Sequence, residues 1–334
     1  MFDTEWKKLL TEVKDNGVKV NRDSKRSFRE IISYQFKLDN PLDRIIYNDT
    51  FSASIFQYIG QFLWISQGSF HTEEIAYYAP FSKTYSSDGI TMIGAYGPRL
   101  FGIHHMNQIK HVTAILDEDL YRRRAVASIY LPQFDQHTSK DEVPCTLNLQ
   151  YLVREDCVNA VTYMRSQNAY RLLPYDVFLF TMLQEYVNSI LTTAHETKLG
   201  TYNHFSGSFH IYEDEIPLIE EALVQNPISV PMNPMPSHDV ILWVQKLNKF
   251  EALVRTTVSS YKALKKNVDF DMFLETLDKS FFEPYWKQMG LVLVCYGAIQ
   301  TKNGSQYTQL LSKLNSVYKP LVEKYVLKKN ILFD

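Results

Sequence analysis

The sequence predicts an α+β fold that continues into an α-helical carboxy-terminal region. Short β-rich runs at 125–130 and 147–153 are mixed with helical segments before residue 230. The segment 227–236 contains four prolines, which is typical of an irregular connector, and the patterns beyond it are helical. We therefore expect one domain at 1–230 and a helical extension, packed on it, at 231–334.

Two elements of the first domain follow from local patterns. The run 147–153 alternates apolar and polar residues with a period of two, which indicates a strand with one covered face. Pro174 suits the first turn of a helix, and the apolar run 177–183 after it indicates a helix that is buried on most sides. Asp176 is then expected in the first turn of this helix, close to the sheet.

The last predicted helix spans 307–325. Its apolar residues recur at helical spacing along one face, as in a helix that packs on a core, and Pro320 is expected to bend it.

Composition and charge limit the classes of function. A chain of 334 residues with 45% hydrophobic content can bury a large core. Its 35 basic and 37 acidic residues are interspersed, so no basic stripe indicates a nucleic-acid partner. We expect any phosphate to be bound locally. No apolar run reaches membrane-spanning length and the amino terminus lacks a secretory pattern, so we expect a cytoplasmic protein without a membrane partner.

The three cysteines, Cys145, Cys157 and Cys295, are too few and too irregularly spaced for a disulfide framework or a four-ligand zinc site. This favours a reducing compartment and predicts no metal. An isolated cysteine is more often a buried small side chain than a nucleophile. Only Cys145 has a context that points to chemistry, and we interpret the other two as structural.

That context is a series of short blocks in a fixed order. They are Gln61-Phe62-Leu63-Trp64, Gly94-Ala95-Tyr96-Gly97, 123–128, Pro144-Cys145-Thr146, Met164-Arg165-Ser166-Gln167-Asn168, Leu173-Pro174-Tyr175-Asp176 and 207–212. In this order they resemble the thymidylate synthase superfamily, and most closely its (deoxy)cytidylate 5-hydroxymethylase branch. The resemblance covers about residues 15–225. It implies a three-layer α+β catalytic domain with a mostly antiparallel sheet, and a homodimer that binds a pyrimidine nucleoside monophosphate.

The resemblance assigns Cys145 as the nucleophile. A thiolate that adds to carbon 6 of a pyrimidine turns the ring into an enamine, whose carbon 5 can attack a one-carbon electrophile. Arginines that converge on the substrate phosphate are expected to lower the pKa of the thiol. A structural cysteine is the alternative. By the same resemblance, Tyr96 and Gln61 belong to the catalytic site.

Phosphate recognition is assigned by resemblance to several side chains. They are Arg165 and Ser166 from the same chain, and Arg123 and Arg124 from the partner subunit. Guanidinium groups suit a phosphate dianion because they can donate two parallel hydrogen bonds. Arg22 is assigned to a mobile amino-terminal loop, and a one-residue shift would place Arg26 or Lys25 there instead. Taken singly, each arginine is more typical of a solvated surface than of a binding site.

His210 and Tyr212 are assigned to the sugar hydroxyl. Their spacing of two residues in an extended segment puts both side chains on one face, which suits contact with a single hydroxyl. No third ligand accompanies them, so a metal site is not expected. Asn168 is assigned to both the nucleotide and the cofactor.

Asp176 is expected to read the base. The synthases that act on uracil carry asparagine here, whereas an ionised carboxylate only accepts hydrogen bonds and so matches the exocyclic amine of cytosine. A capping role in the first turn of its helix is the alternative. Thr146 and Met164 also differ from the histidine and glutamine of the synthases, and both resemble the hydroxymethylases.

The cofactor side of the site departs from the superfamily pattern. The resemblance implies methylene-tetrahydrofolate, yet Gln61 replaces a usual glutamate, Asn168 a usual aspartate and Leu172 a usual glycine. Glutamine cannot exchange protons as a carboxylic acid does. Tyr78 and Phe81 are the candidates for an aromatic wall beside the folate, with core packing as the alternative.

Together these residues predict 5-hydroxymethylation of CMP or dCMP with methylene-tetrahydrofolate and water. Two alternatives stay open. One is another one-carbon transfer to the same nucleotide, including methylation. The other is a nucleotide-binding regulatory protein that has lost folate catalysis, which the changes at Gln61, Asn168 and Leu172 favour.

Overall fold

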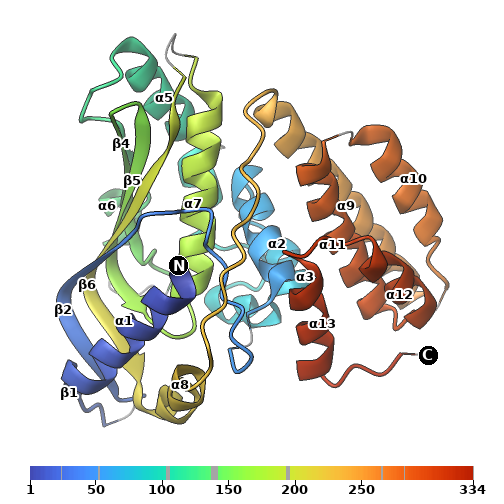
Figure 1. Cartoon of the computed structure of the whole chain (residues 1–334), viewed down its shortest axis with the longest axis horizontal. Helices are drawn as coiled ribbons and strands as arrows, with labels where there is room; N and C mark the ends of the chain where they lie inside the picture. Colours follow the sequence, from blue (N-terminus) through green and yellow to red (C-terminus); the bar gives the residue numbers. More distant parts are fainter. Residues whose placement is uncertain are drawn as a thin grey trace.

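The computed structural model describes residues 1–23, 25–51, 53–102, 106–136, 142–192, 196–264, 266–281 and 283–333. Within them lies a six-stranded sheet with the order β1-β2-β6-β5-β4-β3 (Figure 1). The strands are β1 (Val18–Val20), β2 (Phe28–Leu38), β3 (Val126–Ser128), β4 (Thr146–Arg154), β5 (Cys157–Asn168) and β6 (Lys198–Tyr212). Strands β5 and β6 run parallel and the other neighbours antiparallel. The expected α+β fold with a mostly antiparallel sheet is confirmed.

Helices α1 (Phe2–Asn16) and α7 (Leu173–Ile190) pack on the sheet (Figure 1). The expected helix at Pro174 is therefore present and extends further than its apolar run. Most of α7 is buried because its other side contacts α2 (Ile55–Ser66), which forms the next layer. Ser54 caps α2 by accepting a hydrogen bond from the backbone N–H of Gln57.

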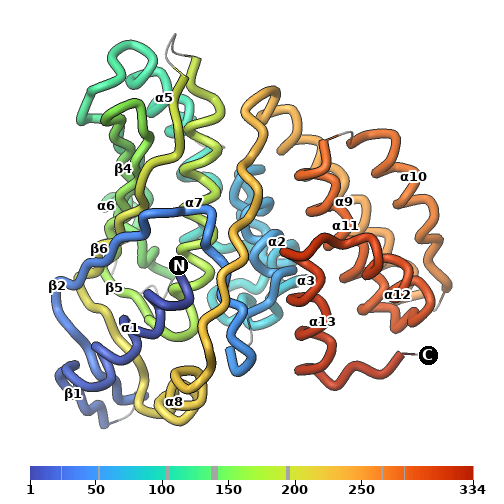
Figure 2. Tube along the Cα trace, in the orientation of Figure 1, coloured from blue at the N-terminus to red at the C-terminus, as the bar shows by residue number. Residues whose placement is uncertain are grey.

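Shorter elements connect these layers. They are α3 (Thr72–Tyr78), the 3-10 helix Pro80–Tyr85, α4 (Tyr96–Phe101), α5 (Gln108–Glu118), α6 (Pro132–Asp135), the 3-10 helix Glu213–Glu215 and α8 (Ile216–Leu223). The segment between α8 and α9 contains no helix or strand over 226–236, as its prolines predict, and Figure 2 shows it rising as an extended trace.

The carboxy-terminal region is helical, as expected. It comprises α9 (Val240–Ala263), α10 (Phe270–Ser280), α11 (Pro284–Gln300), α12 (Gly304–Ser312) and α13 (Lys319–Lys328). Helices α9 and α11 pack on α2, and one continuous cluster of buried apolar side chains runs through both parts of the chain. The domain boundary at residue 230 stays a prediction.

Two element predictions need correction. The stripe at 307–325 forms two helices rather than one bent helix, because the Asn315 side chain accepts hydrogen bonds from the backbone N–H groups of Val317 and Tyr318 and turns the chain. Pro320 then lies in the first turn of α13, where its missing N–H costs nothing. The run 125–130 is a strand only over Val126–Ser128.

Candidate active site

A cavity of about 300 Å³ brings together residues that are distant in the sequence. Its walls come from α2, the 3-10 helix Pro80–Tyr85, residues 92–96, the segment before β4 and the start of α7. Of the expected site residues, it is lined by Gln61, Phe81, Tyr96, Cys145, Arg165, Leu172 and Asp176. The proposed nucleophile, base reader and one phosphate ligand therefore share one cavity.

Arg165 holds the segment that carries Cys145. Its guanidinium donates from Nε to the Pro144 carbonyl (2.9 Å) and from Nη2 to the Val143 carbonyl (3.0 Å), and its backbone N–H donates to the Cys145 carbonyl (2.8 Å). Burial raises the pKa of the Cys145 thiol, Arg165 opposes that rise, and Asp176 adds to it. The thiol is therefore predominantly protonated at neutral pH, and its activation calls for more positive charge than Arg165 supplies.

The two positions that resemble the hydroxymethylases touch one another. Thr146 and Met164 are opposite each other in the β4–β5 ladder, and the Thr146 hydroxyl lies 3.0 Å from the Met164 sulfur. The same hydroxyl lies 3.1 Å from the phenol oxygen of Tyr96. The contact with Thr146 thus holds the Tyr96 hydroxyl beside the residue that follows Cys145 in the sequence.

Asp176 faces the cavity from the first turn of α7. Its Oδ2 accepts a hydrogen bond of 2.9 Å from Gln167 Nε2. The side chain hydrogen-bonds Gln167, and its position in the first turn of α7 also suits a negative charge, so both roles described for Asp176 are compatible with this geometry. Burial raises the pKa of Asp176 to about 7, against a smaller lowering by Gln167. At neutral pH the carboxyl is thus divided between its protonated and ionised forms.

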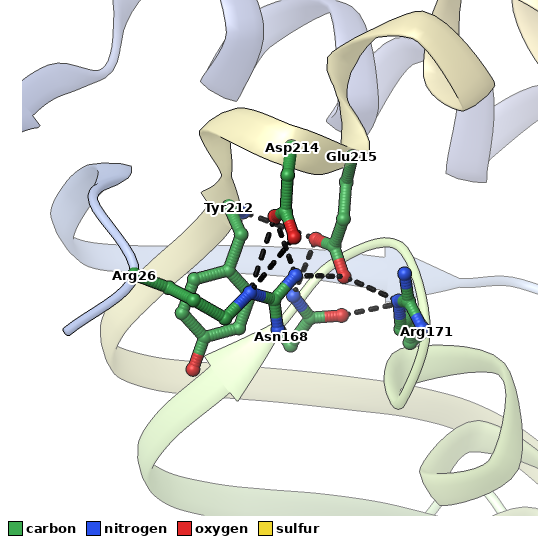
Figure 3. A network of polar contacts seen from close by, with 6 residues as sticks. All are labelled: Arg26, Asn168, Arg171, Tyr212, Asp214 and Glu215. Carbon is green, nitrogen blue, oxygen red and sulfur yellow. Dashed lines mark hydrogen bonds and ion pairs between the residues drawn. The ribbon is translucent and has the colours of Figure 1, made fainter.

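His210 and Tyr212 lie at the end of β6 with their rings 5.3 Å apart. The Arg26 guanidinium lies 3.7 Å from the centre of the Tyr212 ring and pairs with both carboxylate oxygens of Asp214 (Figure 3). Arg22 is exposed. The structure therefore places Arg26, the alternative, beside the proposed sugar contacts.

The side-chain amide of Asn168 forms its hydrogen bonds outside the cavity. It donates to Glu215 Oε2 (2.9 Å) and accepts from the backbone N–H of Arg171 (2.6 Å) (Figure 3). Glu215 is 0% exposed and also accepts from Arg171 Nε and from the backbone N–H of Tyr212. Asn168 does not line the cavity, and the expectation that it binds cofactor there is not met because this buried network occupies its amide.

The aromatic wall is partly different from the expected one. Tyr78 is 4% exposed, its hydroxyl donates to Glu251 of α9 (2.8 Å), and it does not line the cavity. We therefore withdraw Tyr78 as a cofactor contact. Phe81 does line the cavity, together with Trp64 and with Tyr85, which sequence reasoning missed. Tyr85 is the last residue of a short 3-10 helix, so no helical or strand periodicity of apolar residues distinguishes it in the sequence.

Glu142 is a second residue that the sequence did not single out. Its carboxylate accepts hydrogen bonds from the backbone N–H groups of Ser87 and Ile93 and so ties the 86–93 loop to the segment before Cys145. Gly94 permits this approach, because a Cβ there would lie 2.8 Å from the Glu142 carbonyl oxygen. In the sequence, the feature that could have pointed to Glu142 is its position two residues before Pro144.

Arg123 and Arg124 are exposed in the turn that precedes β3 and do not line the cavity of their own chain. Arg124 forms an ion pair with Glu118 (3.5 Å), and the Arg123 carbonyl accepts from Gln150 Nε2 (2.8 Å). Ser166, on β5, pairs in register with Ser208 and also lies outside the cavity wall.

Other residues carry less chemistry. Cys295 is fully buried in α11, and burial raises the pKa of its thiol, as expected of a structural cysteine. In the part of the chain that the structure describes, no cluster of three or more His, Cys, Asp or Glu side chains could hold a metal ion. Across the same ranges, no helix is long and apolar enough to cross a membrane.

The six-stranded sheet and the cavity that gathers Cys145, Arg165 and Asp176 lie within the part of the chain that a family model matches. The thymidylate synthase family model matches residues 4–270, and the chain belongs to that family. It is a one-carbon transferase that acts on carbon 5 of a nucleotide. The one-carbon donor of the family is methylene-tetrahydrofolate.

Relatives place the chain beside the hydroxymethyltransferase branch. Deoxyuridylate hydroxymethyltransferase of Pseudomonas phage M6 is 25% identical over 286 residues, which cover 83% of this chain and 77% of that protein. The enzymes of the same name from Delftia phage PhiW-14 and Bacillus phage SP01 are 29% and 26% identical, over 54% and 62% of this chain. The matches span about half of those two proteins, 53% and 56% of their lengths.

Proposed function

We propose that this enzyme hydroxymethylates carbon 5 of a cytidine or deoxycytidine monophosphate. The observation that carries the proposal is the carboxyl of Asp176, which shares a cavity with Cys145 and is held by Gln167. The synthases have an amide at the equivalent position of the motif. A carboxyl at this position changes whether the edge of cytosine or the edge of uracil can form hydrogen bonds with this side chain.

The protonation state of Asp176 decides the pairing. A neutral carboxylic acid has one donor and one acceptor, so it can pair with the amine and N3 of cytosine or with N3–H and O4 of uracil. An ionised carboxylate only accepts and therefore faces O4 of uracil with negative charge. Cytosine instead directs its amine, a hydrogen-bond donor, toward the carboxylate. Selectivity for cytosine should therefore grow above the pKa of Asp176, about 7.

The remaining roles follow from position. Cys145 adds to carbon 6 once its thiol is deprotonated, and Arg165 supplies part of the necessary positive charge. We assign Arg26, His210 and Tyr212 to the sugar and phosphate, because the Arg26 guanidinium and the His210 ring both contact the Tyr212 ring, although all three lie outside the wall of the cavity. Gln61 can orient a water molecule by hydrogen bonding but cannot take its proton.

The cavity offers the aromatic surface that a folate needs but lacks the carboxylate that is usual in the family. Trp64, Phe81 and Tyr85 offer aromatic surface for stacking, and Leu172 adds apolar surface. Asn168 replaces the usual carboxylate partner, and its amide is occupied in a buried network. When bound, methylene-tetrahydrofolate supplies the one-carbon unit.

A uridine nucleotide is the second candidate. The hydroxymethyltransferase relatives are named for deoxyuridylate, and the neutral form of Asp176 can pair with uracil. No contact in the structure selects ribose or deoxyribose, so both sugars belong in the test.

The test is to incubate the protein with CMP, dCMP, UMP and dUMP, each with methylene-tetrahydrofolate, at pH 6.5 and pH 8.5. We expect cytidylates to gain CH₂O, with selectivity over uridylates rising about tenfold or more at the higher pH. Product mass is the measurement. Gain of CH₂ would identify methylation, binding without product would favour the regulatory alternative, and exclusive turnover of uridylates would overturn the choice of base.

We also propose that the enzyme is a homodimer in which Arg123 and Arg124 complete the site of the partner subunit. Both arginines are exposed outside their own cavity, while the Cys145 thiol calls for more positive charge. On the sheet, Tyr163 and Phe205 form a half-exposed stacked pair with ring centres 5.5 Å apart, which suits a covered interface.

Complementation tests the shared site. Arg124→Ala and Cys145→Ala subunits should each be inactive as homodimers, but their mixture should recover about one quarter of the wild-type activity, because half of the dimers contain one intact site. Activity after refolding an equal mixture is the measurement. Heterodimers that form and stay inactive would show that Arg124 acts within its own chain or not at all.

A further inference from the structure

Two helices of the carboxy-terminal region contact the elements that build one wall of the active-site cavity. Residues of α2, of α3 and of the 3-10 helix Pro80–Tyr85, which follows α3 directly, line this wall. Helices α9 and α11 pack on α2 (Figure 1). Each of them also forms a hydrogen bond with one of the last two residues of α3, Tyr77 and Tyr78. The carboxy-terminal region thus supports the wall without lining the cavity itself.

Glu251 of α9 is the centre of these contacts. It is 5% exposed, and its carboxylate accepts a hydrogen bond of 2.8 Å from the Tyr78 hydroxyl. Arg255, one turn further along α9, donates to both carboxylate oxygens at 2.8 and 3.3 Å. Arg255 also lies 3.8 Å from Glu74 of α3. Because charge-assisted hydrogen bonds to both oxygens fix the carboxylate, it presents an acceptor of defined position to α3.

Tyr78 connects this acceptor to α2. Burial, with a smaller contribution from Glu251, raises the pKa of Tyr78 well above its usual value, so the hydroxyl keeps the proton that it donates. Gly60 of α2 approaches the ring so closely that a Cβ there would lie 2.4 Å from a ring carbon. Tyr296 of α11 has its ring centre 5.3 Å from that of Tyr78 and donates to the Tyr77 carbonyl at 2.9 Å. The end of α3 is therefore held against α2 by two helices of the carboxy-terminal region.

The position of Tyr78 determines where the adjoining wall lies. Ile75 and Ala79 line the cavity from α3 and its last turn, and Phe81 and Tyr85 line it from the 3-10 helix. A single residue, Ala79, separates Tyr78 from this 3-10 helix. Groups that bind a ligand must be held within about 0.5 Å of their productive positions by the residues that support them. Loss of the contact with Glu251 should therefore loosen the aromatic surface of the cavity.

We propose that Glu251 is a positioning residue for the aromatic wall of the cavity, and that the carboxy-terminal helices thereby take part in binding the one-carbon donor. Glu251 acts through Tyr78 and touches no ligand itself. The consequence for the donor rests on the folate proposed above to stack on Phe81 and Tyr85. The consequence for the wall does not depend on any ligand.

Two matched substitutions in the full-length protein separate positioning from simple loss of stability. Tyr78→Phe removes the hydroxyl that Glu251 binds but keeps the ring against Gly60. Tyr47→Phe is the control, because the buried Tyr47 lies outside the cavity wall and its hydroxyl donates to the Val317 carbonyl at 2.9 Å. Each variant loses one buried hydrogen bond between the carboxy-terminal region and the rest of the chain, so a purely structural effect should appear in both.

The first measurement is calorimetric titration with tetrahydrofolate, which lacks the one-carbon unit and so permits no turnover, in the presence of CMP, dCMP, UMP or dUMP. We expect the dissociation constant of tetrahydrofolate to rise by about three- to tenfold in Tyr78→Phe and by less than about twofold in Tyr47→Phe. Nucleotide affinity should stay unchanged in both, since Cys145 and Asp176 belong to other elements. Glu251→Gln keeps an acceptor for Tyr78 and should weaken tetrahydrofolate binding less than Glu251→Ala.

The second measurement is amide hydrogen exchange of the ligand-free protein. Residues 79–86 should exchange at least about threefold faster in Tyr78→Phe than in the parent protein, and at the parent rate in Tyr47→Phe. Equal effects of the two tyrosine variants, or no effect of Tyr78→Phe, would overturn the proposal. Faster exchange with unchanged tetrahydrofolate affinity would reject the part of the carboxy-terminal helices in donor binding. A parent protein that bound no tetrahydrofolate would count against the proposed function, and hydrogen exchange alone would then decide whether Glu251 positions the wall.

Discussion

A Cys145→Ser variant is expected to lose at least about ten-thousandfold in kcat/KM, because a serine hydroxyl is a far weaker nucleophile toward carbon 6 than a thiolate. The substitution changes only one atom at a site where the backbone is independently held. The Cys145 carbonyl still accepts from the Arg165 N–H, and the Arg165 guanidinium still binds the two carbonyls before it. Nucleotide affinity, measured by calorimetry, should therefore change little while turnover collapses.

Cys157→Ser provides the matched control. Cys157 is also a free cysteine, at the start of β5 and outside the cavity, so its replacement should change turnover by less than about twofold. If Cys145→Ser turned over substrate within tenfold of the parent enzyme, the covalent mechanism would be wrong. If Cys157→Ser were equally inactive, the loss at Cys145 could not be ascribed to nucleophilic attack.

The parts of the fold set by local pattern were predictable. Strand β4 follows from strict alternation over 147–153, and α7 follows from Pro174 and a continuous apolar run. The split of the last helix was not predictable from apolar spacing. Its cause is the hydrogen bonding of Asn315 to the backbone, which interrupts the helix without interrupting the apolar stripe.

Within the site, sequence reasoning found the residues that belong to contiguous motifs and misplaced those that depend on tertiary packing. Cys145, Arg165 and Asp176 do share a cavity. Tyr78 and Tyr85 are both aromatic and close in sequence, yet they lie in different environments. Tyr78 is buried against Glu251 of a distant helix, whereas Tyr85 lies in the cavity wall.

The buried polar side chains of β6 were hidden for a related reason. Along β6, polar side chains occur on both faces, so alternation alone does not reveal that Tyr202, His204 and Ser206 are on the buried one. Helices α1 and α7 both contact β6, and the sequence predicted α7 but could not orient it on the sheet.

An Asp176→Asn variant should reverse the base preference of the enzyme. An amide has a fixed donor and a fixed acceptor, which can pair with O4 and N3–H of uracil. Cytosine needs the amide in the reverse orientation, with its N–H₂ group toward N3, so an amide held in the orientation that suits uracil pairs less well with cytosine. We expect the ratio of kcat/KM for uridylate to that for cytidylate to rise by about a hundredfold to ten-thousandfold. Asp214→Asn, at an exposed carboxylate outside the cavity, is the control and should leave the ratio unchanged.

The same substitution should also change how stability depends on pH. The pKa of Asp176 is about 7 in the folded protein and near its model value of 3.8 when unfolded. The native state therefore holds a proton that the unfolded state releases, and the stabilising contribution of Asp176, complete below the lower value, is lost as pH rises through the higher one. Between pH 4 and pH 8 the loss amounts to about 2–4 kcal/mol.

Asp176→Asn lacks this titration, so its free energy of unfolding relative to the parent protein should improve on going from pH 4 to pH 8. Urea denaturation at both pH values measures the difference. A variant that reversed the base preference but showed no such gain would retain Asp176 as the base reader and reject its raised pKa. A variant that gained stability with unchanged preference would reject Asp176 as the residue that separates cytosine from uracil, and the deoxyuridylate in the names of the relatives would then be the better guide to the substrate.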